Sequence, residues 1–297
     1  MTSTRTPSAR LIVENLANAT AMLGGGVRSV LPFARSRSEG ELSQTMKGPS
    51  ARLLDAYNQW TGMDMARFGD SLPPHFAASN MALAMISKLT ARAPYPLLSV
   101  LNQGVSLRIN QPLPCTGPYL LRGNLVDASD DGYRARIHSH ICFGTQANPE
   151  ALLIDAYAAV VLKSRPGKQG KKAEEPAFTR IGQWQGAANE GVNFFKLTGD
   201  FNPIHTLEPF ARRTSFGGCI MHGYGAFAQT FEIIRNQGMD IAEIDVRFVR
   251  PVPLPSPVID IQISEQANEQ GRHAFRLIDE QQNVYHAGEF LPRGSKV

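Results

Sequence analysis

The sequence predicts an α+β protein made of two copies of one fold, each a long buried helix wrapped by a curved antiparallel sheet. Two observations support this prediction. Arginine, proline and glycine recur at a constant spacing across the two halves, and each half contains one long apolar helix-like run together with several strand-like runs. A chain of 297 residues is long enough for one large domain or for two of roughly 100 to 150 residues.

The repeat is visible in two segments, SLRINQPLPCTGPYLLRGNL from Ser106 and DVRFVRPVPLPSPVIDIQIS from Asp245. Matching positions lie 139 residues apart throughout. They are Arg108 and Arg247, Pro112 and Pro251, Pro114 and Pro253, Pro118 and Pro257, and Gly132 and Gly271. A spacing shared by five positions indicates an internal duplication.

Each copy contains the same predicted elements. In the second copy, residues 222–236 are apolar on nearly all sides, which is typical of a helix enclosed by a sheet. Residues 76–89 are the corresponding helix of the first copy. Turn-like compositions separate the strand-like runs, which are 97–109, 119–126, 133–143 and 152–162 in the first copy and 244–249, 258–264, 273–279 and 284–291 in the second.

The predicted domain boundaries follow from these elements. Residues 51–165 form the first copy and residues 177–297 the second. Residues 166–176 between them are polar and rich in glycine and lysine, as expected of a solvated linker. Residues 1–50 fit neither copy, so we treat them as an N-terminal extension with no assigned function.

Composition narrows the class of protein. The net charge is +4, and no lysine- and arginine-rich helix is evident, which argues against nucleic-acid binding and favours a small or carrier-borne anionic partner. Three cysteines without CxxC spacing argue against a disulfide framework or a zinc site. No run approaches the ~18 apolar residues of a membrane span, and no signal peptide is evident, so we expect a cytoplasmic protein. A homodimer is compatible with these features.

The stretch LTGDFNPIHTLEPFA contains the candidate acid–base groups. Asp200 and His205 would lie roughly 140° apart on a helix, but Pro203 between them starts or breaks one. A turn would let the two side chains converge on one pocket, where Asn202 could orient a water or the carboxylate. The alternative is that this stretch is only a turn and helix cap.

Comparison of the two copies favours the acid–base interpretation of this stretch over the turn-and-cap interpretation. At the corresponding place the first copy has WTGMDMARF, in which Thr61 and Gly62 resemble Thr198 and Gly199. No histidine follows there at the right distance. A polar group of residues retained in one copy and absent from the other indicates a site kept for a reaction.

Downstream, GGCIMHGYGAF places Gly223 at the start of the buried helix. Backbone N–H groups at a helix N-terminus are unpaired and carry positive potential, so they could hold an oxyanion such as the enolate of a thioester. The alternative is that the glycines only allow tight packing of helix on sheet. We interpret His222 as a first-turn residue outside the catalytic set.

The segment Phe195–Ala211 resembles, position by position, the signature of the MaoC-like dehydratases, the (R)-specific enoyl-thioester hydratases. The matching residues are Phe195, Leu197, Thr198, Gly199, Asp200, Asn202, Pro203, Ile204, His205 and Ala211. The downstream His-Gly also matches. The resemblance extends from about residue 70 to the C-terminus and implies a double hotdog fold with a degenerate first copy.

The resemblance also implies an activity. It implies reversible hydration of trans-2-enoyl thioesters, or dehydration of (3R)-3-hydroxyacyl thioesters, in fatty-acid metabolism, by Asp200 and His205 and without a metal or other cofactor. The substrate carrier would be coenzyme A or acyl carrier protein. Arg212 and Arg213 either contact a phosphate of that carrier or are ordinary surface charges. A hotdog acyl-thioesterase and a non-catalytic acyl-thioester-binding protein are the alternatives.

Overall fold

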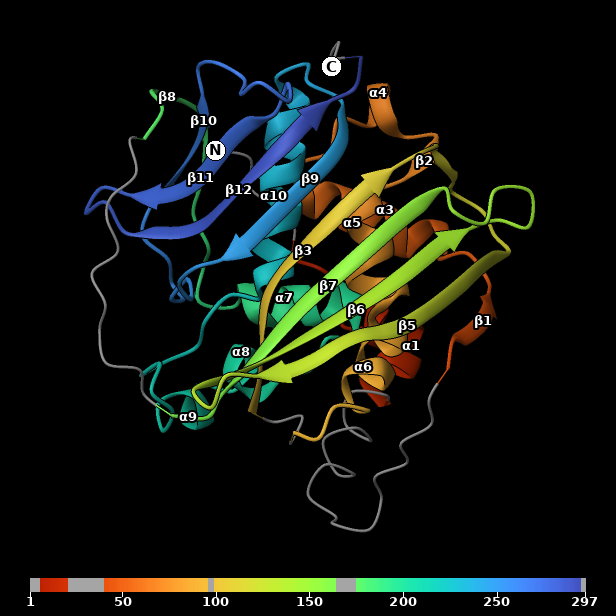
Figure 1. Cartoon of the computed structure of the whole chain (residues 1–297), viewed down its shortest axis with the longest axis horizontal. Helices are drawn as coiled ribbons and strands as arrows, with labels where there is room; N and C mark the ends of the chain where they lie inside the picture. The colour runs from red at the N-terminus through yellow and green to blue at the C-terminus, as the bar shows by residue number, and fades with distance from the viewer. Residues whose placement is uncertain (1–5, 21–39, 96–98, 164–174, 295–297) are drawn as a thin grey trace.

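The sheet dominates the computed structural model, which describes residues 6–20, 40–95, 99–163 and 175–294. Within these residues ten strands form one antiparallel sheet, in the order β1-β5-β6-β7-β3-β9-β12-β11-β10-β8 (Figure 1). The strands are β1 (Leu42–Met46), β3 (Val100–Ile109), β5 (Tyr119–Asp130), β6 (Arg134–Gly144), β7 (Leu152–Val161), β8 (Phe178–Trp184), β9 (Ile241–Phe248), β10 (Ile259–Ser264), β11 (His273–Asp279) and β12 (Val284–Pro292). A separate two-stranded ribbon pairs β2 (Ser71–Leu72) with β4 (Leu113–Pro114).

Each copy contributes five strands, and the equivalent strands of the two copies follow one another in the same order from the two edges of the sheet. This arrangement confirms the predicted tandem fold. The first copy supplies β1-β5-β6-β7-β3 and the second supplies β8-β10-β11-β12-β9. The copies join where β3 pairs with β9, from Gly104 opposite Arg247 to Arg108 opposite Glu243. Gly104 has φ +154°, and a Cβ there would lie 2.1 Å from the Val246 carbonyl oxygen. Only glycine therefore allows this close pairing.

The helices lie together behind the sheet in Figure 1. They are α1 (Leu11–Glu14), α3 (Ala51–Thr61), α4 (Met65–Phe68), α5 (Pro74–Phe76), the π-helical turn η1 (Ala77–Met81), α6 (Leu83–Thr90), α7 (Glu190–Thr198), α8 (Pro203–Thr206), α9 (Glu208–Ala211) and α10 (Gly223–Asn236). The helix α10 matches its prediction within one residue. The predicted first-copy helix over 76–89 runs through three consecutive segments, α5, η1 and α6.

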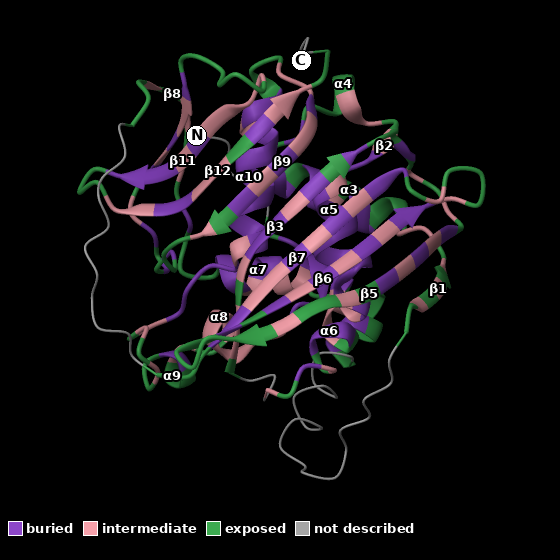
Figure 2. Ribbon diagram, in the orientation of Figure 1, coloured by how far each residue is buried: buried purple, intermediate pink, exposed green. Residues whose placement is uncertain are grey.

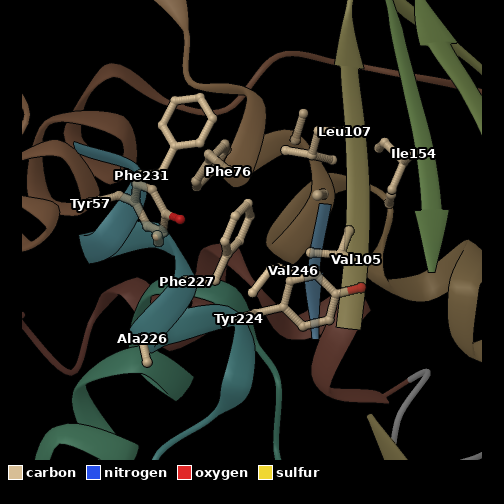
Figure 3. Packing of buried hydrophobic residues seen from close by; sticks show 14 of the residues in the cluster. Tyr57, Phe76, Val105, Leu107, Ile154, Tyr224, Ala226, Phe227, Phe231 and Val246 are labelled. Carbon is tan, nitrogen blue, oxygen red and sulfur yellow. The ribbon is translucent and has the colours of Figure 1, made fainter. Parts of the chain in front are cut away.

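The helices α10 and α5 meet at the centre of one continuous core. Figure 3 shows Phe227 and Phe231 of α10 near Tyr57 and Phe76, with strands of both copies beside them. All four rings are at most 1% exposed. Burying one such side chain contributes about 2–3 kcal/mol. The two copies therefore share one core. Figure 2 shows the alternation of buried and more exposed residues along the strands that such packing requires.

Part of the N-terminal extension belongs to the folded body. Strand β1 pairs with β5 at one edge of the sheet. The Asn15 side chain donates to the Lys196 carbonyl oxygen at 2.9 Å, and that of Asn18 to the Thr198 carbonyl oxygen at 2.9 Å. Residues 6–20 therefore support the end of α7. Residues 21–39 of the extension and most of the predicted linker 166–176 lie outside the described residues, and the domain boundaries stay predictions.

Candidate active site

The acid–base motif begins where α7 ends. Gly199 ends the helix in the left-handed conformation, with φ +76°, and its N–H bonds the Phe195 carbonyl oxygen at 2.8 Å. A Cβ at Gly199 would lie 2.7 Å from the Asn15 carbonyl oxygen, so a side chain here would displace the N-terminal segment. Because the glycine reverses the chain, Asp200 lies off the helix axis, and α8 begins three residues later at Pro203.

The structure separates the roles of Asn202 and Asp200. The Asn202 side chain caps α8, accepting a hydrogen bond from the Ile204 N–H at 3.2 Å, with Pro203 at the first helical position. Asn202 also lines the large cavity described below. Within the described residues, no protein group donates a hydrogen bond to the Asp200 carboxyl group. The turn-and-cap interpretation therefore accounts for Asn202 and leaves the Asp200 side chain unexplained.

Asp200 is 5% exposed. Burial raises its pKa from 3.8 to about 7, because a carboxylate loses its hydration in the protein interior. The neighbouring phenol of Tyr224 also has a raised pKa, caused first by burial and then by the charge of Asp200. A carboxyl group poised near neutral pH can hold or release a proton under working conditions.

His205 lies on α8 and lines the cavity. Its Nδ1 lies 2.8 Å from the Ile220 carbonyl oxygen. Since a carbonyl only accepts, Nδ1 must carry the proton and Nε2 is left as an acceptor. Burial lowers the His205 pKa to about 4, although the hydrogen bond to Ile220 opposes that shift. His205 is therefore a neutral imidazole with one basic nitrogen.

Gly223 begins α10, a helix of 14 residues, and lines the same cavity. A Cβ at this position would lie 2.4 Å from the Phe248 ring, so glycine is required for the strand to pack against the helix start. The Gly223 N–H has no partner within the helix, whereas the Gly225 N–H bonds the His222 carbonyl oxygen at 2.9 Å. The predicted oxyanion-binding position is therefore adjacent to the cavity that His205 lines.

The cavity has a volume of about 820 Å³ and lies where β3 and β9 separate beyond their last paired residues, Gly104 and Arg247. Both copies line it. The first copy contributes the start of β3, Val100 to Gln103, and the ends of its neighbouring strands. The second contributes Asn202, Ile204 and His205 of the acid–base motif, Gly223 and the segment from Phe248 to Val252. Asp200 is not among the lining residues. Each copy alone would supply only part of the wall.

The arginines that line the cavity are not the two that the sequence offered as carrier contacts. Arg212 and Arg213 are not among the residues that line it, and Arg212 is exposed and bonded to Glu208 at 2.9 Å. Four other arginines line the cavity, and sequence reasoning did not single them out as site residues. They are Arg134, Arg136, Arg247 and Arg250.

His222 is closer to the motif than its sequence position indicates. Its Nε2 lies 3.0 Å from the Asp200 carbonyl oxygen, and its ring centroid lies 3.8 Å from that of His205. His286, on β12, also lines the cavity and is 2% exposed. The only sequence signal for His222 was the His-Gly pair before the buried helix, and none pointed to His286.

The first copy has a matching place without the acid–base groups. Gly62 ends α3 with φ +76°, as Gly199 ends α7. Met63 follows Gly62 where Asp200 follows Gly199, and Phe68 stands six residues after its glycine, as His205 does. The Arg235 guanidinium lies 3.4 Å over the Phe68 ring, beside a smaller cavity of about 310 Å³. The first copy thus repeats the left-handed glycine at the end of its helix and lacks the aspartate and the histidine.

Two further properties concern the described part of the chain. No helix there is long and apolar enough to cross a lipid bilayer. No group of three or more histidine, cysteine, aspartate or glutamate side chains is placed there to hold a metal ion.

Comparison with known proteins gives matches in sequence and in structure. Residues 167–283 match the family model of the MaoC like domain. A 3-hydroxybutyryl-CoA dehydratase of Methylorubrum extorquens is 45% identical over 49 residues, which are 16% of this chain and 31% of that protein. The matched region therefore spans about a third of the length of this curated relative.

Two solved structures share the fold over most of the chain. HtdX of Mycobacterium tuberculosis has a TM-score of 0.68 and 16% identity, covering 85% of this chain and 100% of that chain. Peroxisomal multifunctional enzyme type 2 from Drosophila melanogaster has a TM-score of 0.65 and 17% identity, covering 91% of this chain and 52% of that chain. Residues 167–283 therefore resemble a MaoC like domain, and the chain as a whole has the α+β tandem hotdog fold.

Proposed function

We propose that the protein reversibly adds water across the double bond of trans-2-enoyl thioesters, and in reverse dehydrates (3R)-3-hydroxyacyl thioesters. One observation carries the proposal: a buried carboxyl group, Asp200, and a neutral imidazole, His205, are joined through His222 beside a cavity that both copies line. The MaoC-like match and the similarity to a dehydratase support the same reaction class.

The protonation states favour one division of labour. The unprotonated Nε2 of His205 removes a proton from water, whose oxygen attacks the β-carbon, while neutral Asp200 delivers a proton to the α-carbon. A proton passing from His205 to Asp200 then restores both groups. The opposite assignment needs ionised Asp200 with protonated His205. With pKa values of about 7 and about 4, that state has a population of about one molecule in a thousand.

Gly223 completes the proposed site. Attack at the β-carbon moves negative charge onto the thioester oxygen, and the N–H groups at the start of α10 are oriented to stabilise that charge. No protein side chain is needed for this step. Asn202, which lines the cavity, is proposed to orient the water or the substrate.

The carrier is proposed to be coenzyme A or acyl carrier protein, both of which present phosphate. Positively charged groups at the cavity support this choice, because guanidinium groups bind phosphate strongly. Arg134 and Arg136 lie on β6 of the first copy and are exposed. We propose them as phosphate contacts. The earlier candidates Arg212 and Arg213 stay a prediction that the same experiment tests.

Replacing Arg134 and Arg136 together by glutamine is expected to raise the KM for an enoyl-coenzyme A about 3- to 10-fold with little change in kcat, since partly exposed ion pairs contribute modestly to binding. The KM for an enoyl thioester of pantetheine without phosphate should not change. The matched control replaces Arg212 and Arg213 by glutamine. If only that control raises KM, the sequence-based assignment is correct and ours is wrong.

The pH dependence of kcat/KM tests whether the active enzyme holds one proton between Asp200 and His205. Activity should rise with pH through about 4, because protonated His205 cannot act as a base, and should fall above about 7, because ionised Asp200 cannot donate a proton. Replacing Asp200 by Asn should remove the upper limb from the residual activity. A wild-type profile that instead rises through pH 7 would assign the base to Asp200.

The reaction itself is tested by following the absorbance of a crotonyl thioester and of longer enoyl thioesters alongside a free-thiol assay. Loss of the enoyl band without thiol release is expected. Thiol release would identify a thioesterase, and binding without either change would identify a non-catalytic acyl-thioester-binding protein. A cytoplasmic location and a homodimer stay predictions from the sequence.

A further inference from the structure

His222 occupies the N-cap of α10, yet its side chain does not cap that helix. Serine, threonine, aspartate and asparagine are the usual residues here because their short side chains bond the first-turn N–H groups. The His222 ring instead approaches the acid–base motif, where its Nε2 lies 3.0 Å from the Asp200 carbonyl oxygen. A carbonyl only accepts, so Nε2 carries the proton.

The other nitrogen of His222 is unusual. Within the part of the chain that the structure describes, Nδ1 is buried and has no hydrogen-bond partner, and the residue is 2% exposed. An unpaired buried polar atom is destabilising, because it loses its bond to water and gains none in the protein. Burial, followed by the proximity of His205, lowers the His222 pKa well below its usual range and keeps the ring neutral. An apolar ring would fill this space without that cost.

The ring of His222 is fixed between two others. On α7, Phe194 is fully buried and its centroid lies 4.8 Å from that of His222. His205 packs against His222 with centroids 3.8 Å apart and planes inclined by 32°. Together with the bond from His205 Nδ1 to Ile220, this contact restricts rotation of the His205 ring. His222 is thus bonded to the backbone of one proposed reacting group and packed on the side chain of the other.

We propose that His222 is a positioning residue that holds the Asp200 backbone through its Nε2–H and the His205 ring through stacking, so that acid and base keep one relative geometry. This inference rests on the proposed function insofar as Asp200 and His205 are the reacting pair. The His222 ring also covers the His205 ring, and burial is the cause that lowers the His205 pKa. The other titratable or charged groups are Tyr224, whose pKa the charge of Asp200 helps to raise, and His286 and Arg250 in the cavity wall.

Two variants separate the two contacts. His222→Phe keeps a ring for stacking and loses the N–H to Asp200. His222→Gln keeps an N–H donor and loses the ring. Both are expected to lower kcat about 10- to 100-fold with KM within about 2-fold of wild type, because small displacements of reacting groups are costly. Only His222→Gln should shift the acidic limb of the pH profile to higher pH, because only that variant removes the ring that covers His205.

The matched control is His273 on β11, which also lies 3.0 Å from a backbone carbonyl oxygen, that of Ser264, and packs on Phe290. It is not among the residues that line the cavity. His273→Phe and His273→Gln should leave kcat and the pH profile unchanged, whatever they do to the thermal midpoint. If the loss of any packed histidine lowered kcat, the His273 variants would lose kcat as the His222 variants do.

Imidazole nitrogen NMR supplies a readout that needs no substrate. In the wild type, His222 should carry its proton on Nε2 and His205 on Nδ1, and His222→Gln should raise the His205 pKa toward its ordinary value. A wild-type His222 protonated on Nδ1 would overturn the proposal without any variant. Wild-type turnover in both variants, with unchanged His205 titration, would also overturn it. Absence of hydratase activity with the NMR results as expected would reject the proposed reaction and leave the positioning contacts standing.

Discussion

Replacing Asp200 by Asn or His205 by Gln is expected to lower the turnover of an enoyl thioester by about 100-fold or more in each case. Both changes approximately preserve size and hydrogen bonding but remove proton transfer. The double variant should lose little beyond the worse single variant, because groups acting as one unit on one water are not additive. Turnover is measured for the two singles and the double with crotonyl-coenzyme A and a longer enoyl thioester.

The thermal midpoint of Asp200→Asn should rise at high pH although its turnover falls. The folded pKa of Asp200 is raised above its unfolded value, so the stability that its neutral form contributes is fully present below about pH 3.8 and is lost as pH rises through about 7. The difference corresponds to about 4 kcal/mol. Asparagine cannot ionise, so Asp200→Asn should raise the thermal midpoint at pH 8 relative to wild type and have a smaller effect at pH 4.

Asp260→Asn is the matched control, since Asp260 lies on β10 and is not among the residues that line the cavity. It should leave turnover unchanged. Near-normal turnover of Asp200→Asn would contradict the acid–base assignment. Unfolding of that variant would favour the interpretation of the motif as a structural turn.

The isolated C-terminal copy, beginning at about Glu174, is expected to lose at least about 10-fold in activity and not to be a fully active monomer. Without the first copy, β9 loses its partner β3 and becomes an edge strand. Phe231 loses its contact with His75, whose ring centroid lies 5.0 Å away, and the cavity loses the wall formed by Val100 to Gln103. Activity on a long enoyl thioester and molecular mass in solution are measured together.

Co-expression of the two halves as separate chains is the control for this experiment. If the β3–β9 junction and the shared core are sufficient for assembly, the pair should recover activity that neither half has alone. A C-terminal copy that hydrates long enoyl substrates at the full-length rate as a monomer would contradict the requirement for both copies.

The central strands and the helix α10 were predictable because their sequences are strongly periodic or apolar and bounded by turns. The predicted strand over 273–279 coincides with β11, and the predicted helix over 222–236 differs from α10 by one residue. The edge strands β1 and β8 were not predicted as strands. Both are largely half-exposed or exposed, so they lack the apolar alternation that marks a strand with one buried face.

The site was predictable only where it is local in sequence. Asp200, Asn202 and His205 lie within one motif, and Gly223 lies at the start of the predicted helix. Arg134 and Arg136 are more than 60 residues from that motif along the chain, and they line the same cavity as His205 only because β3 pairs with β9. The orientation of His222 depends on the position of Asp200 and Phe194, which sequence spacing does not define.

The most direct test of the proposed hydration is mass spectrometry of the product formed from crotonyl-coenzyme A in water labelled with oxygen-18. We predict one labelled oxygen at carbon 3 of an intact 3-hydroxybutyryl-coenzyme A, with the label absent from the acyl carbonyl. Formation of labelled free carboxylate with release of coenzyme A, or recovery of unlabelled substrate from a protein that binds it, would contradict hydration at Asp200 and His205.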